Sequence, residues 1–168
     1  MKKVLALTLV AVLLAGCGAA ASVKTGLGHT ISVAKSKDAA ADAEGLAQVD
    51  TVMAAVTVDS SKKILGVVID TAQVKVNFDA TGKITTDLNK EQQTKVELGD
   101  LYGMKKASSI GKEWYEQIAD LEKWMIGKTV DKITAVQNPA DVPDLKSKVT
   151  VTITDYQKAV AEAVENAR

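Results

Sequence analysis

The sequence predicts a single α+β domain in which an antiparallel sheet carries two packed helices. Three observations lead to this fold class. The chain has 168 residues, which is the usual size of one domain. Apolar residues alternate with period two between residues 48 and 86, as they do in strands. Apolar residues then recur at helical spacing over residues 110–126 and again over 154–167.

The expected strands are separated by polar turns. Residues 52–58 place Val or Ala at every second position, and the β-branched run 64–70 is typical of a buried strand. Between them, residues 59–63 form a turn. A third strand over 74–78 should meet a hairpin turn at 79–82, because Gly82 tolerates a positive φ, and residues 83–86 should return along it. Residues 28–33 also alternate briefly and are a further strand candidate.

Two longer helices are expected to pack on this sheet. The first should be capped by Ser108 or Ser109 and end at Gly127, and a short helical turn should follow over 129–133. Residues 147–153 are β-branched and alternating, which predicts a strand before the closing helix. Thr154 and Gln157 match a capping box at the start of that helix. We expect burial at Val56, Ile69, Trp114, Ile118, Leu121, Val160 and Val164.

Residues 87–112 contain few apolar side chains and three glycines, so we expect a long loop. Long loops in small domains are often functional. A plain surface connection between the sheet and the first helix is the alternative.

Composition excludes several classes of function. The chain has 21 basic and 21 acidic residues, so it lacks the basic surface that a nucleic-acid partner requires. One His and one Cys cannot form a multi-ligand zinc site, a disulfide or a Cys–His catalytic pair. No nucleotide-binding or nucleophile motif is present, and we therefore expect no catalytic residue and no metal site. His29 stands alone and is expected to be a surface imidazole.

The N-terminus carries an export signal. Lys2 and Lys3 precede an apolar run from Val4 to Leu14, which is too short for a membrane span but is the length of a signal-peptide core. The sequence Leu-Ala-Gly-Cys at residues 14–17 resembles the lipobox of bacterial lipoproteins. That resemblance implies cleavage before Cys17 and its modification by acyl chains such as palmitate. An ordinary secretory signal that happens to contain a Cys is the alternative.

The lipobox resemblance also divides the chain. Residues 1–16 are a signal peptide, residues 17–47 a lipidated tether, and residues 48–168 the domain. Two or more acyl chains anchor a protein stably. The expected location is thus the extracytoplasmic face of a cell membrane, anchored by lipid without spanning the bilayer.

The order of expected elements over residues 48–167 resembles the small extracytoplasmic FMN-binding domain. The signature of that family is Ser-Gly-Ala-Thr followed by Thr or Ser, directly before the closing helix. Ser147 and Thr150 match this signature in type and spacing, whereas Lys148 and Val149 stand where Gly and Ala are expected. The resemblance implies a flavoprotein that carries FMN, joined through a phosphoester bond in some members, and that transfers electrons to a redox partner protein.

The resemblance also suggests where the cofactor would bind. A phosphate is expected near the first turn of the closing helix, because helix N-termini attract anions. The flavin ring would then lie toward the long loop. The candidate cofactor-binding residues are Ser147, Thr150 and Thr152 for the phosphate and Tyr102, Met104 and Trp114 for the ring.

Three functions remain open at this stage. The first is flavin binding for electron transfer, covalent or noncovalent. The second is a noncatalytic binding or structural lipoprotein that kept the fold without the cofactor, which the departures at Lys148 and Val149 favour. The third is a small-molecule or peptide-binding surface protein that uses the loop over residues 87–111.

Overall fold

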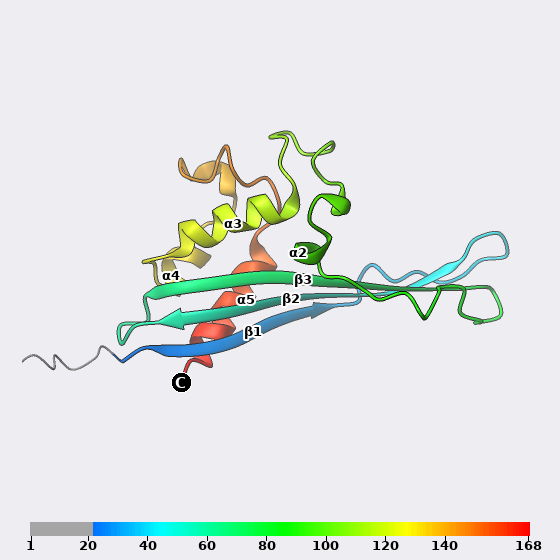
Figure 1. Cartoon of the computed structure of the whole chain (residues 1–168), viewed down its shortest axis with the longest axis horizontal. Coiled ribbons are helices and arrows are strands. Elements are labelled where there is room, and N and C mark those ends of the chain that lie inside the picture. Colours follow the sequence, from blue (N-terminus) through cyan, green and yellow to red (C-terminus); the bar gives the residue numbers. More distant parts are fainter. Residues whose placement is uncertain (1–21) are drawn as a thin grey trace, which may run out of the picture.

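The computed structural model describes residues 22–168 and shows a mixed α+β fold (Figure 1). The predicted signal peptide and Cys17 lie outside these residues. The strands are β1 (Lys24–Ser32), β2 (Gly45–Val58) and β3 (Ile64–Phe78). The helices are α2 (Lys95–Leu98), η1 (Gly99–Tyr102), α3 (Trp114–Met125), α4 (Val130–Thr134), η2 (Pro139–Asp141) and α5 (Thr154–Glu165).

The three strands form an antiparallel sheet in the order β1-β2-β3. β1 pairs only with residues 50–58 of β2, whereas β2 and β3 pair over their whole length. The β2–β3 ribbon therefore continues beyond the end of β1, and the loops after β1 and β3 lie at its far end (Figure 1). The two predicted strands at 52–58 and 64–70 belong to this ribbon, which confirms the antiparallel sheet.

The sheet differs from the expectation in two places. Strand β1 begins at Lys24, within the range expected to be a tether, so the folded part starts well before residue 48. The expected return strand over 83–86 is reduced to a single bridge between Phe78 and Ile84. The Asp79–Gly82 turn is present as predicted, with Gly82 at φ 85°. The residues after this turn are exposed and so have no core to pack against.

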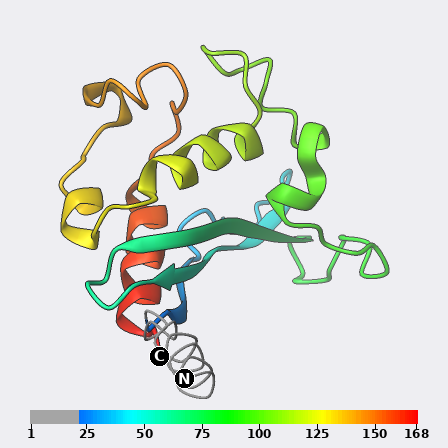
Figure 2. The same cartoon turned by 60° about the vertical axis from the view of Figure 1, so that its left-hand side comes forward.

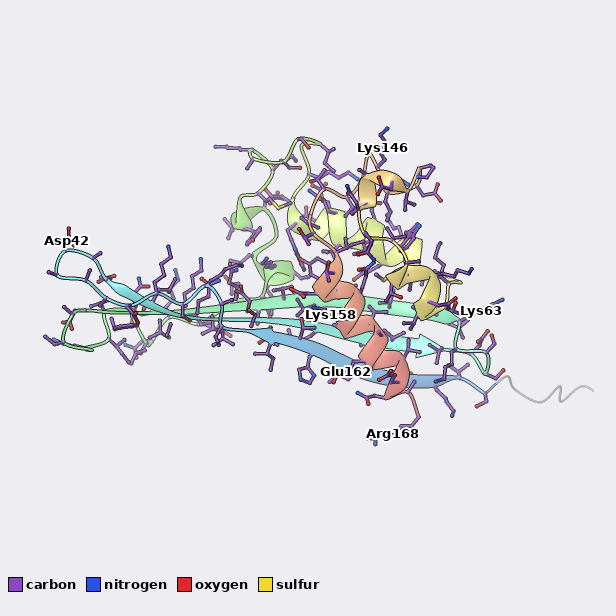
Figure 3. The ribbon with its side chains drawn as sticks, turned by 180° about the vertical axis from the view of Figure 1, so that it is seen from behind. Asp42, Lys63, Lys146, Lys158, Glu162 and Arg168 are labelled. Carbon is purple, nitrogen blue, oxygen red and sulfur yellow. The ribbon has the colours of Figure 1, made fainter. Side chains whose placement is uncertain are left out.

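Helix α5 crosses one face of the sheet and lies against β1 and β2 (Figure 3). Gly26 and Gly28 make this approach possible. A Cβ at Gly26 would lie 1.9 Å from the Ala163 carbonyl oxygen, and one at Gly28 would lie 2.1 Å from that of Ala159. Helix α3 runs beside β3, on the side of the domain that also carries α4 (Figure 2).

The core fills the space between this sheet face, α3, α4 and α5. All seven side chains predicted to be buried belong to it, which confirms the faces assigned to the strands and helices. The segment between η2 and α5 closes the core with Leu145, Val149 and Ile153, each at most 2% exposed. Residues 147–153 do this as turns and irregular chain, so the predicted strand before the closing helix is wrong.

Both long helices begin differently from the prediction. Glu113 caps α3 in a capping box with Glu116, in place of Ser108 or Ser109. Helix α5 follows Ile153 without any side-chain cap, so its predicted capping box is absent. The Gln157 side chain instead donates to the carbonyl oxygens of Ile133 and Val136, at the end of α4. The short helix predicted at 129–133 is present as α4.

Within residues 22–168, none of the helices has the length and apolar composition to cross a membrane. The same residues contain no group of three or more side chains that could hold a metal ion.

Candidate functional site

The N-terminal end of α5 faces a cleft with a volume of about 120 Å³, which we call the Lys95 cleft. Larger hollows lie near Lys62 and Glu165. We focus on the Lys95 cleft because it contains Thr71 Oγ1, the buried side-chain atom of the described residues that has no hydrogen-bond partner. The walls come from β2, β3, α2, the loop after β1 and the start of α5. They are Lys35, Asp50, Val52, Thr71, Gln73, Lys95, Thr152, Asp155 and Tyr156.

Two buried hydroxyl groups in this cleft have protons to donate. Thr71 is 3% exposed, and its side-chain oxygen Oγ1 has no hydrogen-bond partner in the described chain. The Tyr156 hydroxyl accepts a bond of 2.8 Å from Trp114 Nε1, but no group between residues 22 and 168 accepts its own proton. Buried donors are nearly always paired in native proteins, so these two groups favour an acceptor from outside the chain.

Tyr156 remains protonated under ordinary conditions. Burial raises the pKa of its hydroxyl, whereas the hydrogen bond from Trp114 lowers it, and burial dominates. The nearby Thr71 hydroxyl also lowers the pKa of Tyr156, although the two oxygens do not meet the geometry of a hydrogen bond. The Tyr156 and Trp114 rings pack edge to face with centroids 6.0 Å apart, which fixes the hydroxyl in place.

Lys95 brings a positive charge to the same cleft. Its Nζ lies 4.8 Å from the centroid of the Tyr102 ring and 5.3 Å from that of Trp114, within the range of cation–π contacts. The ion pairs formed between residues 22 and 168 do not include Lys95. The ammonium group is thus held by aromatic faces, and its N–H groups remain free for an anion.

The chain on either side of Lys95 is tied to strand β3. Thr94 forms a bridge with Ala72, and the amide of Val96 donates to Asp70 Oδ1 over 3.2 Å. A capping box between Thr94 and Glu97 closes the single turn of α2. These bonds fix the backbone of Lys95 against the sheet, which positions its side chain between β3 and the aromatic rings.

The N-terminus of α5 adds unpaired amides. The first three residues of a helix have no intrahelical acceptor for their N–H groups, and no side chain caps α5. This end of a helix carries about half a positive charge. Thr152 and Asp155 line the cleft beside it, and the Asp155 side chain is paired with Lys158 over 3.4 Å on the outside of the helix.

The opposite end of the cleft is polar, and the negative charge of Asp50 there is compensated by neighbouring side chains. Asp50 forms an ion pair of 2.7 Å with Lys35 and accepts bonds from the side-chain amides of Gln48 and Gln73. Burial opposes ionisation of Asp50, but the hydrogen bonds from Lys35, Gln48 and Gln73 together lower its pKa below the ordinary value. Its charge is therefore compensated within the protein.

The structure brings together three of the six predicted cofactor residues. Thr152 lines the cleft, and Tyr102 and Trp114 adjoin it through Lys95. Met104 lies outside the cleft, packed partly against the core, and its amide donates to Glu113.

The other two predicted phosphate residues do not reach the cleft. Both the amide and the hydroxyl of Thr150 bond to Gln117 Oε1, at 2.8 and 3.2 Å. Ser147 is exposed in the turns before α5. Val149 is 2% exposed, so the residue that replaces the Ala of the family signature is a core side chain. Of the three residues predicted to converge around one anion, only Thr152 therefore lines the cleft.

The three cleft residues with free donor groups, Thr71, Lys95 and Tyr156, were not among the predicted site residues. Thr71 lies between the predicted strands 64–70 and 74–78, and Tyr156 belongs to the apolar stripe of the predicted closing helix. Nothing in the sequence around either residue marks a free hydroxyl. Lys95 could have been found, because Thr94 and Glu97 have the spacing of a capping box inside the supposed loop. That motif places a helix start, and hence an ordered residue, at position 95.

Comparison with known proteins does not assign a family. No family model and no solved structure matches the chain. A stretch of 41 residues is 49% identical to a chlorophenol reductase from Desulfitobacterium hafniense. The match covers 24% of this chain and 12% of that protein, so this chain corresponds to a small part of its relative.

Proposed function

We propose that this protein is a lipid-anchored, extracytoplasmic protein whose domain binds FMN, with the phosphate of the cofactor in the Lys95 cleft. The observation that carries the proposal is the buried Thr71 hydroxyl, which has no partner in the described chain and lies beside a lysine without a carboxylate. A buried donor without an acceptor costs about 1–3 kcal/mol, and a phosphate oxygen would recover this cost.

The residues of the cleft fit a phosphate group in size and chemistry. The volume of about 120 Å³ equals that of about four liquid waters, which suits one phosphate and excludes a three-ring isoalloxazine. Lys95 supplies charge, Thr71, Thr152 and Tyr156 supply hydroxyl donors, and α5 supplies its unpaired first-turn amides. Tyr102, half-buried under the Lys95 ammonium, is the aromatic residue at the cleft that would contact the flavin.

The proposed attachment is noncovalent. Thr150, the residue that corresponds to the phosphoester position of the family signature, has its hydroxyl engaged by Gln117. Bound FMN supplies one- and two-electron transfer, while the protein binds the cofactor, orients it and limits its contact with water. We propose a redox partner protein as the source or acceptor of the electrons.

Two further observations support parts of this function. The lipobox at residues 14–17 supports the membrane anchor at Cys17. The protein that shares the 41-residue stretch is named for a reduction, the conversion of a chlorophenol, and redox chemistry is common to that name and to a flavin. The match is too short to transfer the role of any residue.

The test uses the full-length protein purified from membranes. We expect a yellow preparation whose flavin is released by denaturation, with an intact mass that contains no FMN adduct. The apo-protein should quench FMN fluorescence and should bind riboflavin, which lacks the phosphate, at least about tenfold more weakly, a difference of about 1.4 kcal/mol. Lys95→Gln should weaken FMN binding, whereas Lys83→Gln, an exposed lysine in the turn after β3 and away from the cleft, should leave it unchanged.

The second candidate is a noncatalytic lipoprotein that kept the fold without the cofactor. The burial of Val149, where the family signature has Ala, favours it. A colourless preparation from cells, together with no quenching of FMN at micromolar protein, would support this candidate and reject flavin binding.

A further inference from the structure

One face of the sheet is not covered by any element of the described chain. Helix α5 crosses the other face, over Gly26 and Gly28, and α3 runs beside β3. Figure 1 therefore looks onto a bare face, with α5 behind the strands. We call this bare surface the open face. The register places Leu27, Ala55 and Val68 in one row across it, and Ile31, Thr51 and Ala72 in another.

The open face is apolar and depleted of charge. Leu27, Ile31 and Val68 expose 66, 61 and 65% of their surfaces. A quarter of the chain's residues are charged. The two rows contain none of these residues, and the row between them, which holds His29 and Met53, adds one carboxylate, Asp70. Loss of charge together with exposed aliphatic side chains is the mark of a protein interface.

The size of the open face suits a small dimer interface. Strands rise about 3.3 Å per residue and lie about 4.8 Å apart, so the three-stranded part measures roughly 30 by 14 Å. With the ribbon beyond β1, where Val49 is 37% exposed, the projected area is about 500 Å². Two such faces would bury about 1,000 Å² in total, the lower limit for a specific interface.

We infer that the open face packs against the open face of a second copy of this chain, related by a two-fold axis along β2. Such an axis places β1 of one copy over β3 of the other. Leu27 then faces Val68 of the second copy and Ile31 faces Ala72, while Ala55 lies on the axis with its own counterpart. His29, whose imidazole is paired with Glu162, then lies opposite Asp70 of the second copy, which accepts from the amides of Thr71 and Val96 within its own chain. One surface is thus complementary to itself, as a two-fold dimer requires.

The composition of the open face argues for a protein partner over a lipid surface. Segments that bind membrane interfaces combine apolar side chains with Lys, Arg and large aromatic residues. The three rows of the open face contain none of these residue types, and Arg168 lies beside Leu27 and Ala55 at the β1 edge. Association through the sheet edges is also disfavoured, because helix carboxylates already occupy the free amides of His29 on β1 and Ile69 on β3.

The test is cross-linking of the full-length protein in native membranes. Packed sheets lie about 10 Å apart, beyond the roughly 7 Å between Cα atoms that a disulfide allows. Ala55→Cys is therefore treated with a short bismaleimide. We expect a homodimer, with a yield at least about tenfold that of the wild type and of Lys158→Cys, whose side chain lies on α5 and is 64% exposed. Adding Leu27→Lys to Ala55→Cys should abolish the product.

Each other result contradicts the homodimer. Equal cross-linking of Ala55→Cys and Lys158→Cys would mean random collision. A product with the mass of a different protein would assign the open face to a heterologous partner. Fast labelling of Ala55→Cys by a water-soluble maleimide without cross-linking would show a monomer, and labelling only by a lipid-phase reagent would show a membrane contact. Circular dichroism of each variant verifies that it is folded.

Discussion

Glu122 of α3 accepts a hydrogen bond of 2.6 Å from the backbone amide of Ile69, on the outer edge of strand β3. The other edge of the sheet has the same arrangement, because Glu162 of α5 accepts a bond of 2.6 Å from the amide of His29 on β1. Free edge amides invite pairing with other strands. A glutamate from each long helix thus blocks one edge of the sheet while it ties that helix to the strand.

The Glu122 contact predicts a pH dependence of stability. Burial raises the pKa of Glu122 above its ordinary value of 4.5, the Ile69 hydrogen bond opposes the rise, and the charge of Asp70 adds to it. The folded state then binds a proton more tightly than the unfolded state, so this group's contribution falls as pH rises from 4.5 through the raised value. Glu122→Gln keeps an oxygen that can accept from the Ile69 amide but does not titrate. We expect its stability not to fall over this pH range, and the variant to be at least as stable as the wild type at neutral pH.

Urea unfolding across the acid to neutral range measures this effect. Glu122→Ala is the control, because it removes the acceptor of the Ile69 amide and should be less stable than Glu122→Gln at every pH. If the wild type and Glu122→Gln show parallel pH profiles, Glu122 does not carry the predicted titration.

The turn at residues 59–63 predicts a stabilising substitution. Asp59 Oδ1 accepts bonds from Ser61 and from the Lys63 amide, and the turn at 79–83 repeats this pattern with Asp79. The fourth position is Gly82 at φ 85° in one turn and Lys62 at φ 60° in the other. The left-handed region costs a side chain about 1 kcal/mol. Lys62→Gly should therefore stabilise the protein by about 0.5–1 kcal/mol in urea unfolding. Gly82→Ala should destabilise the protein by a similar amount. A less stable Lys62→Gly or a more stable Gly82→Ala would contradict this prediction.

The crossing of α5 over β1 depends on Gly28. A Cβ there would meet the Ala159 carbonyl oxygen at 2.1 Å and the Ala163 amide nitrogen at 2.4 Å, both backbone atoms that cannot move independently of the helix. We expect Gly28→Ala to cost about 3 kcal/mol or more. Gly66→Ala is the matched control, since its Cβ would meet nothing closer than 4.0 Å and its φ is ordinary. It should stay within about 1 kcal/mol of the wild type. Similar unfolding midpoints for the two variants would show that α5 adjusts its position freely.

The lipobox predicts the fate of Cys17. Acylation and cleavage both need the thiol, so Cys17→Ala should leave unprocessed precursor or release the protein from the membrane fraction. Fractionation and the intact mass of the wild type and variant measure both outcomes. A Cys17→Ala protein that is still processed and still partitions with membranes would contradict lipid anchoring.

The parts of the fold that the sequence predicts are those set by periodic burial. Val52 to Val58 and the stripe from Trp114 to Met125 each face one core, so their spacing is sufficient to place them. The prediction fails where contacts with residues distant in sequence determine the local structure. Gln157 has capping-box spacing but is used for the carbonyl groups of Ile133 and Val136, and β-branched residues 147–153 are held by the core and by Gln117 instead of by a neighbouring strand.

The candidate site was less predictable than the fold because its members are distant in sequence. Thr71, Lys95 and Tyr156 come from β3, α2 and α5, and they share no motif. The predicted site around Ser147 and Thr150 followed the family signature. In the structure, Val149 is buried, so this segment packs onto the core instead of forming a binding site. Thr152 lines the cleft, and Tyr102 and Trp114 adjoin it through Lys95, so three of the predicted residues lie in one region of the structure.

Thr71 provides the prediction that separates a binding site from an ordinary core. Its buried hydroxyl has no partner in the described chain, so Thr71→Val, which keeps the shape of the side chain, should stabilise the ligand-free protein by about 1 kcal/mol. The same substitution should weaken FMN binding, because it removes a donor from the cleft. Thr51→Val, on the open face of β2, is the control and should leave FMN binding unchanged.

Thermal unfolding of the apo-protein and fluorescence titration with FMN measure the two effects. A gain in stability with unaltered FMN binding would place the phosphate elsewhere, and a loss of stability would show that the Thr71 hydroxyl already has a partner within the folded protein. A gain in stability together with weaker binding is the outcome expected of a residue kept for its ligand at the expense of the fold.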